Sequence, residues 1–492
     1  MGKTNKKVPA ETESRQNSGT KLKKKKNPNR EIMRITYLFL LIFVGMIGYY
    51  IKFHIKDSDD IINNTYNKRQ AILEQEITRG NILSDDGQIL AATLTDEEGN
   101  DYRKYPFDNL FAHSVGFSTH GTTGIELLAN YKLLTSNASI IQTALNDFKG
   151  VKNPGNNVLT SLNIDMTRAA YEALGEHQGA VIVLEPSTGK ILTMVSKPDF
   201  NPNEIDSIWE ELVSGEGNSN LVNRTTSGLY TPGSTFKLFT LLEYIHENPD
   251  YNAYSYDCTS RITIDGNTVH CAGRSWHGGE NLMESFANSC NSSFVNLGLT
   301  LDKGKFKNLC NSLLFNSELP LSYPYNESSF VLNESSSGFE TMQTVIGQGE
   351  TLITPVHLAM IAAAIQNNGI LMKPYVITEI QSSEGKKLEE YKPEEYKRLL
   401  SAEDSAMLKD FMRGVVTNGT GTKLNTDAYN AYGKTGTAQI NDGSQTNSLF
   451  MGFAEKDGKA VAICVVMEDM PEGSTFAVPA AKKVLDEYFR VF

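Results

Sequence analysis

A run of 17 uncharged, mostly apolar residues, 35–51, is the sequence feature that most restricts how this chain can fold. At about 1.5 Å per residue, a helix of this length reaches roughly 25 Å, near the lower limit for crossing a bilayer. Tyr49 and Tyr50 lie at its far end, where aromatic side chains favour the membrane interface. The run therefore predicts a transmembrane anchor over residues 35–51.

The charges on either side of this run predict its orientation. Residues 1–34 contain eight Lys and three Arg against three Glu, a net charge of +8; the whole chain totals −12, which leaves −20 for the rest. Because basic flanks stay on the cytoplasmic side, we expect residues 1–34 to form a cytoplasmic tail and the chain after Lys52 to lie outside. The acidic total argues weakly against a nucleic-acid partner.

Two other interpretations of the run fit less well. A cleaved signal peptide would need a small-residue cleavage site, and residues 52–56 offer none. A buried core helix does not usually follow a basic head that contains Pro, Asn and Ser. We therefore expect an uncleaved, single-pass anchor in the cell membrane.

The external region divides into a small module and a large one. Residues 52–155 read as short elements broken by turns, with Asp86-Gly87 between apolar alternations predicting a hairpin. Residues 156–492 begin and end with strand patterns and have helices between, which predicts an α+β domain with an antiparallel sheet. The expected strands are 157–162, two within 179–195, 431–439, 448–454 and 461–467, and the expected helices include 165–174 and 479–489.

Ser234 and Lys237 form the first of three chemical motifs. Pro232-Gly233 is a turn, and apolar residues at helical spacing follow it, so Ser234 should open a helix with Lys237 on the same face. A serine hydroxyl needs an adjacent base to act as a nucleophile, and a lysine can serve if burial lowers its pKa. Alone the pattern is weak, because Ser-x-x-Lys also occurs at positions 18–21, 187–190 and 383–386.

The other two motifs are Ser289-Cys290-Asn291 and Lys434-Thr435-Gly436-Thr437. Ser-x-Asn is also weak alone, because residues 161–163 have the same form. A phosphate-binding loop ending at Lys434 is excluded because position 428 is Ala rather than the required Gly. The order of the three motifs, with intervals of about 50 and then about 145 residues, is typical of penicillin-recognising serine acyltransferases.

At this level of detail the sequence resembles the class B penicillin-binding proteins, monofunctional peptidoglycan D,D-transpeptidases. The resemblance runs from the anchor to the C-terminus, in a short form without C-terminal repeat domains. It implies a penicillin-binding, serine β-lactamase-like transpeptidase domain over 156–492 on a pedestal, or dimerisation-like, domain over 52–155. The further motifs that carry it are Arg79-Gly80, Gly121 to Glu126, Asn223-Arg224, His277-Gly278, Gly347 to Glu350 and Thr354-Pro355.

The resemblance implies a role for each residue of the first two motifs. Ser234 would attack the carbonyl between the last two D-alanines of a stem peptide, and Lys237 would take its proton. Ser289 would relay a proton to the leaving amine, while Asn291 would hydrogen-bond both Lys237 and the substrate amide. β-Lactams would acylate the same serine.

The third motif would hold the substrate. The resemblance implies that Lys434 supplies positive potential and helps to hold Ser289, and that Thr435 and Thr437 bind the terminal carboxylate. Gly436 lets a substrate backbone approach the strand closely. The backbone N–H groups of Ser234 and Thr437 would form the oxyanion hole.

Three other functions remain as alternatives. A D,D-carboxypeptidase would use the same chemistry with water as acceptor, and a membrane-bound β-lactam sensor or scaffold would keep the site for binding alone. A β-lactamase would not need the pedestal or the anchor, and Cys290 departs from the Ser-Asp-Asn motif of the best-known lactamase class. Residues 52–155 leave no room for the glycosyltransferase domain of a bifunctional enzyme.

The five cysteines fit no disulfide framework. Cys258 and Cys271, with His270 and His277, match no strong zinc spacing, so we expect no metal and no cofactor. Free or buried thiols are favoured, with a Cys258–Cys271 disulfide and a metal site as alternatives. The expected partners are peptidoglycan stem peptides, β-lactams, the membrane and, from the resemblance, a polytopic glycosyltransferase of the shape, elongation, division and sporulation (SEDS) type.

Overall fold

The computed structural model describes residues 28–53, 73–215, 217–440, 445–471 and 476–492, and the chain divides into two units, Met1–Ile62 and Asn63–Phe492. The first unit contains helix α1 (Pro28–Lys52). Its segment Ile32–Lys52 is long and apolar enough to cross a membrane, and none of it is buried. The helix thus includes the predicted span 35–51 and exceeds it at both ends; residues 1–27 of the predicted cytoplasmic tail lie outside the described residues.

A five-stranded antiparallel sheet forms the centre of the second unit. It joins the two strands predicted within 179–195 to the three predicted near the C-terminus. Its order is β17 (Asn430–Ile440), β18 (Gln445–Lys456), β19 (Lys459–Met470), β7 (Gly179–Leu184) and β8 (Ile191–Lys197). The strand predictions are confirmed here. Strands β17, β18 and β19 extend beyond the predicted ranges because their antiparallel pairing continues to the connections between them.

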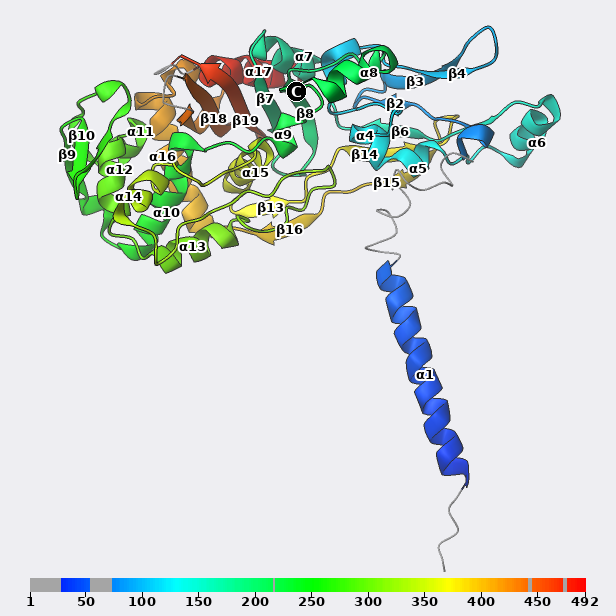
Figure 1. Cartoon of the computed structure of the whole chain (residues 1–492), viewed down its shortest axis with the longest axis horizontal. Helices are drawn as coiled ribbons and strands as arrows, with labels where there is room; N and C mark the ends of the chain where they lie inside the picture. The colour runs from blue at the N-terminus through cyan, green and yellow to red at the C-terminus, as the bar shows by residue number, and fades with distance from the viewer. Residues whose placement is uncertain (1–27, 54–72, 216, 441–444, 472–475) are drawn as a thin grey trace, which may run out of the picture. The chain divides into compact units, whose positions relative to one another are not determined.

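Alternate residues of the sheet enter two separate cores. Along β7, Ile182 and Leu184 pack with α15 (Pro355–Gln366), whereas Val181 and Val183 pack with α7 (Ile164–Leu174) and α17 (Ala477–Val491). Figure 1 shows α7 and α17 on one side of this sheet and α15 on the other. Because successive side chains of a strand point to opposite faces, a sheet covered on both sides reads as a continuous apolar run.

The helical half of the domain continues from the edge strand β17. It places α16 (Ala402–Asn418) against β17 and against α11 (Leu282–Ala287), and α10 (Lys237–Glu247) against α12 (Asn291–Gly298). Helix α8 (Ile205–Ser214) instead packs with Ala112 and Phe117 of the pedestal, and α9 (Arg224–Ser227) lies against β7, β8 and α15. The other helices of the helical half are α13 (Lys303–Ser312) and α14 (Gly338–Thr344). Its short strands are β9 (Ser255–Cys258), β10 (Arg261–Ile264), β11 (Asn267–His270), β12 (Gly278–Asn281), β13 (Ile370–Met372) and β16 (Glu395–Arg398).

The pedestal contributes to a second sheet, of six strands. Its order is β15 (Lys387–Glu390), β14 (Ile377–Gln381), β6 (Asn157–Thr160), β2 (Ile82–Leu83), β3 (Ile89–Thr95) and β4 (Asp101–Lys104). The antiparallel pairing of β2 with β3 confirms the predicted hairpin, and Gly87 has a φ of 85° in its turn. Three of these strands follow residue 155, so the sheet spans the boundary predicted between 52–155 and 156–492.

A buried ion cluster holds the pedestal together. Glu126, on α4 (Gly124–Leu128), is fully buried and accepts hydrogen bonds from Arg79 Nε at 2.6 Å and Arg103 Nε at 2.7 Å. Burial alone would raise the pKa of Glu126, but the two guanidinium groups hold it below its usual value. The Arg79-Gly80 and Gly-x-x-Gly-x-Glu motifs of the sequence thus meet in one contact.

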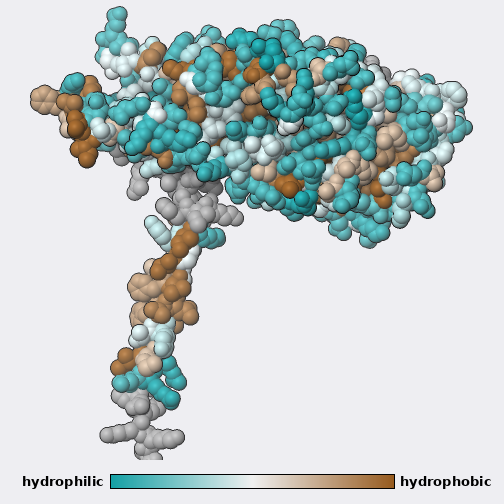
Figure 2. Space-filling model, turned by 180° about the vertical axis from the view of Figure 1, so that it is seen from behind, coloured by the Kyte–Doolittle hydropathy of each residue, from teal (hydrophilic) through white to brown (hydrophobic). Residues whose placement is uncertain are grey.

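One helix of the pedestal exposes an apolar surface. The other elements of this module are β1 (Ile77–Thr78), β5 (Asn153–Pro154), α5 (Asn130–Leu133) and α6 (Ile140–Lys149). On α6, Ile140 and Phe148 are 89% and 91% exposed. Figure 2 shows brown, apolar atoms at this end of the module.

Candidate active site

Ser234 lies in a tight turn that leads into a helix. Residues Gly233–Phe236 form a 3₁₀ turn, and α10 begins at Lys237, so the helix predicted to open at Ser234 starts with a tighter first turn. Gly233 has a φ of 53°, and a Cβ atom there would lie 2.6 Å from the carbonyl oxygen of Thr437. A glycine is therefore needed to bring the half-buried Ser234 against the third motif.

Lys237 joins the first motif to the second. Its side chain is fully buried, and its Nζ donates to the carbonyl oxygen of Ser289 and to Asn291 Oδ1, both at 2.6 Å. Ser289 Oγ lies 3.3 Å from the same nitrogen. The structure thus brings together Lys237, Ser289 and Asn291, as the sequence predicted, although more than 50 residues separate the motifs.

The Ser-x-Asn segment is a sharp connection between two helices. Ser289 follows α11 with a φ of 57°, a left-handed conformation that is uncommon for a residue other than glycine. Cys290 caps α12, and Asn291 is its first residue. Asn291 Nδ2 donates to the carbonyl oxygen of His270 at 2.8 Å, so its side chain is held at both ends. A left-handed backbone conformation such as that of Ser289 persists only where the surroundings fix the backbone, as they do at functional sites.

The third motif lies on the edge strand β17. Lys434 is fully buried and its Nζ is 3.3 Å from the carbonyl oxygen of Thr435, while Thr435 Oγ1 shares a 2.6 Å hydrogen bond with Thr420 Oγ1. A Cβ atom on Gly436 would lie 2.9 Å from Thr235 Cγ2. The strand and the Ser234 turn are therefore packed so closely that only glycine fits at this position. Thr437 is half-buried beside it.

Burial sets the electrostatics of the two lysines. It lowers the pKa of Lys237 to about 8, against an opposing attraction from Cys290, Cys271 and Glu280. Burial, followed by repulsion from Lys237, lowers the pKa of Lys434 well below its usual value. The free amine of Lys237 is thus accessible near neutral pH, and burial disfavours the charged form of Lys434.

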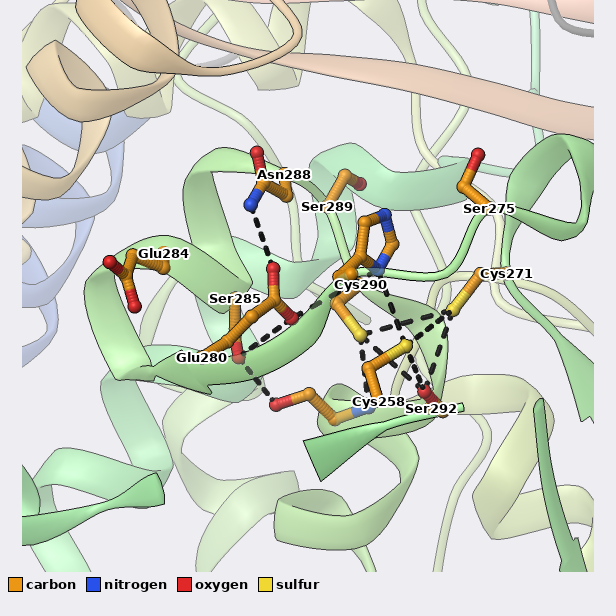
Figure 3. A network of polar contacts seen from close by, with 12 residues as sticks. Cys258, Cys271, Ser275, Glu280, Glu284, Ser285, Asn288, Ser289, Cys290 and Ser292 are labelled. Atoms are coloured by element: carbon orange, nitrogen blue, oxygen red, sulfur yellow. Dashed lines mark hydrogen bonds and ion pairs between the residues drawn. The ribbon is translucent and has the colours of Figure 1, made fainter. Parts of the chain in front are cut away.

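A buried cysteine cluster lies directly behind Ser289 and Asn291. The possible ligand atoms of Cys258, Cys271, His277 and Cys290 all lie within 4.8 Å of one another. Figure 3 shows the sulfur atoms of the three cysteines turned toward one another beside Ser292. The sequence indicates Cys258, Cys271 and His277 as candidates but not Cys290, and it adds His270, which is not a member. The spacings within the cluster, 13, 6 and 13 residues, match no common zinc pattern, so only the fold reveals it.

These features by themselves define a class of protein. An antiparallel sheet covered on both faces has a Lys-Thr-Gly edge strand, and beside that strand lie a serine at a helix start and a buried lysine. This is the arrangement of the penicillin-recognising serine acyltransferases. The chain matches the family described as "Penicillin binding protein transpeptidase domain" over residues 179–486, and the "Penicillin binding protein A dimerisation domain" over residues 79–158.

Individual proteins agree with these matches. The chain is 28% identical over 470 residues to "Peptidoglycan D,D-transpeptidase PbpA" of Mycolicibacterium smegmatis, covering 90% of this chain and 94% of that protein. It is 29% identical, with a TM-score of 0.75, to the crystal structure of a D,D-transpeptidase domain from Eggerthella lenta, covering 84% and 98% of the two chains. The imipenem acyl-enzyme of penicillin-binding protein A from M. tuberculosis gives 26% identity and a TM-score of 0.76, covering 84% and 99%. The chain therefore belongs to the penicillin-binding protein transpeptidase family, in its class B form.

Proposed function

We propose that this chain is a peptidoglycan D,D-transpeptidase that cross-links stem peptides through an acyl-enzyme on Ser234. The observation that carries the proposal is the buried Lys237 Nζ, which lies within hydrogen-bond distance of both Ser289 and Asn291. The names of the relatives and the acyl-enzyme complexes of a protein with the same fold support the same chemistry.

Acylation of Ser234 needs a base, and Lys237 is the candidate. Since its pKa is lowered to about 8, the amine can accept the proton of Ser234 Oγ as that oxygen attacks the carbonyl between the two D-alanines. The bond to the last D-alanine then breaks, and Ser289 Oγ, 3.3 Å from Lys237 Nζ, passes a proton to the departing amine. An amine of a second stem peptide attacks the acyl-enzyme and restores Ser234.

The third motif would bind the donor peptide. Thr435 and Thr437, both on β17, are the candidates for holding the terminal carboxylate, and the N–H groups of Ser234 and Thr437 are the candidates for the oxyanion hole. A bound carboxylate would raise the pKa of Lys434, because an anion favours the charged amine. A bound carboxylate would thus favour the positive potential expected of Lys434.

We also propose the cellular arrangement that the sequence indicates. Helix α1 fits a single-pass membrane protein, with the tail 1–34 cytoplasmic, the anchor 35–51 in the membrane, and the pedestal 52–155 and transpeptidase domain 156–492 outside. We propose that the exposed apolar residues of α6 form the surface through which the pedestal binds a polytopic SEDS-type glycosyltransferase.

The test compares two serines that share the same motif. Full-length protein in detergent is treated with a fluorescent penicillin, and with a stem pentapeptide plus an acceptor amine. The wild type should form a stable covalent label and a cross-linked product, and Ser234→Ala should form neither. Ser187→Ala is the matched control, since Ser187 also precedes a lysine by three residues but is exposed in the turn between β7 and β8.

The products also separate the alternatives. Release of D-alanine without cross-linking when an acceptor is present would identify a D,D-carboxypeptidase. A stable label without any peptide turnover would identify a sensor or scaffold, and rapid hydrolysis of the label a β-lactamase. A label that survives Ser234→Ala would overturn the assignment of the nucleophile.

A further inference from the structure

The four residues Cys258, Cys271, His277 and Cys290 come together because the ends of three strands meet the start of a helix. Cys258 ends β9, which pairs antiparallel with β12, so that Gly278 lies opposite Cys258 and the preceding His277 lies beside it. Cys271 follows β11, and Cys290 caps α12. All three cysteines are at most 3% exposed.

Three distances in this cluster are close to those around one tetrahedral ion, and all four ligand atoms lie within 4.8 Å of one another. Cys271 Sγ lies 3.7 Å from Cys258 Sγ and 3.8 Å from Cys290 Sγ, and His277 Nδ1 lies 3.3 Å from Cys258 Sγ. With zinc bonds of about 2.3 Å to sulfur and about 2.0 Å to nitrogen, a regular tetrahedron has edges of about 3.8 Å and about 3.5 Å. Three sulfurs and one imidazole nitrogen are also a donor set that zinc prefers.

Surrounding donors suit thiolate ligands. Ser292 Oγ donates to Cys258 Sγ at 3.2 Å and lies 3.4 Å from Cys290 Sγ, and the Ser293 N–H donates to Cys290 Sγ at 3.5 Å. Hydrogen bonds of this kind orient the ligands of a metal and stabilise their charge. A disulfide could join only two of the three sulfurs and would leave the third without an equivalent partner.

We propose that Cys258, Cys271, His277 and Cys290 bind a structural zinc ion, which fixes the Ser289–Asn291 segment of the active site. On binding, the three thiols lose their protons to solvent and neutral His277 donates its Nδ1 lone pair, so all four positions of the ion are filled. The zinc is therefore a structural ion and takes no part in acyl transfer.

The zinc would act on the active site along two routes. Cys290 lies between Ser289 and Asn291 in the chain, so a bond from its sulfur to zinc restrains the left-handed turn at Ser289. Cys271 follows His270, whose carbonyl oxygen accepts the hydrogen bond from Asn291 Nδ2. Both the backbone and the side-chain amide of Asn291 are thus tied to a zinc ligand, which makes Cys258, Cys271, His277 and Cys290 positioning residues.

The first experiment measures metal and needs no enzymatic activity. Full-length protein, purified in detergent with a reducing agent and without a chelator, should contain about one zinc ion per chain by elemental analysis. Cys258→Ala and Cys271→Ala should each lose most of the zinc. Cys310→Ala and Cys464→Ala, which remove cysteines that are equally buried but outside the cluster, should retain it.

A second measurement uses only the wild type, so it stands even if the cysteine variants fail to fold. Zinc exchanged for cobalt should give the intense visible bands of tetrahedral cobalt with thiolate-to-metal charge transfer. Wild-type protein that binds neither zinc nor cobalt under reducing conditions would overturn the proposal. So would zinc that remains in the Cys258→Ala/Cys271→Ala double variant, or an intact mass that is two hydrogens lighter and so reveals a disulfide.

A third measurement tests the effect on the active site and rests on the proposed function. Removing zinc from the wild type should slow acylation by a fluorescent penicillin about tenfold to hundredfold, the cost of a displacement of about 1 Å, and added zinc should restore it. Unchanged acylation with the zinc removed would refute the positioning role. If no form of the protein is acylated, the proposed function fails while the metal measurements still decide the zinc site.

Discussion

Lys237 owes its chemistry to the place where the fold puts it. In water an amine of this type is protonated at neutral pH and cannot accept a proton. Here the side chain is buried against Phe294, 5.4 Å from its ring centre, and is held by Ser289 and Asn291. Burial disfavours the ammonium form, and that change converts an ordinary lysine into a candidate base.

The rate of acylation should therefore depend on pH through Lys237. Because burial lowers its pKa to about 8, the amine is protonated and inactive below that pH and free above it. We expect the acylation rate with a fluorescent penicillin to rise about tenfold per pH unit up to about pH 8 and then to level off. Stopped-flow measurements from about pH 6 to about pH 9 would check this.

Lys237→Arg provides the control for this profile. A guanidinium group keeps the positive charge but cannot lose its proton in this range, so the variant should not be acylated at any pH. An acylation rate that does not change between about pH 6 and about pH 9 in the wild type would contradict the role of Lys237 as base.

At the scale of elements, the site depends on how closely one turn and one strand approach. Gly233 and Gly436 remove the two Cβ atoms that would separate the Ser234 turn from β17. In the pedestal, by contrast, the interior is packed with long charged side chains, those of Arg79, Arg103 and Glu126. Such a cluster stabilises the fold only while every charge has its partner.

Glu126→Gln should destabilise the protein strongly. The substitution leaves the guanidinium groups of Arg79 and Arg103 buried without a counter-charge, which costs about 3 to 5 kcal/mol in comparable cases. Urea unfolding near neutral pH, where Glu126 is ionised, would measure the loss.

Glu389→Gln is the matched control for this prediction. It removes a carboxylate that pairs with Lys132 Nζ at 2.5 Å, but both side chains are about a third or more exposed. Exposed pairs of this kind contribute at most about 1 kcal/mol. Equal losses of unfolding free energy in the two variants would show that the buried cluster stabilises the fold no more than an exposed ion pair does.

At the scale of the molecule, an anchor helix and a large acidic unit share one chain. Helix α1 is exposed along its whole apolar length, whereas the unit Asn63–Phe492 buries its apolar residues in continuous cores. An apolar helix of this length fits a single membrane span, as we propose for α1.

The orientation of this anchor can be tested with a reporter. Alkaline phosphatase fused after Phe492 should be active, because that enzyme folds only outside the cytoplasm, and a cytoplasmic reporter at the same position should be inactive. Replacing the four lysines 23–26 by Gln should lower the phosphatase activity, since the basic flank determines the orientation. An inactive phosphatase fusion in the unmodified chain would reverse the proposed topology.

Features that depend on short stretches of sequence could be predicted without the structure. The anchor, the Asp86-Gly87 hairpin, the strands β7 and β17 to β19 and the order of the three motifs all follow from local periodicity and spacing. Apolar periodicity and turn residues determine the secondary structure of a few neighbouring residues. These features can therefore be recognised from the sequence alone.

Only the tertiary structure decided which distant segments meet. It pairs β2 with β6 across the predicted boundary at 155, places Cys290 with Cys258, Cys271 and His277, and lowers the pKa of Lys434 by burying it near Lys237. Strand pairing, ligand geometry and burial each depend on side chains that lie far apart in the chain. No local pattern encodes such contacts, because they arise only when the whole core has packed.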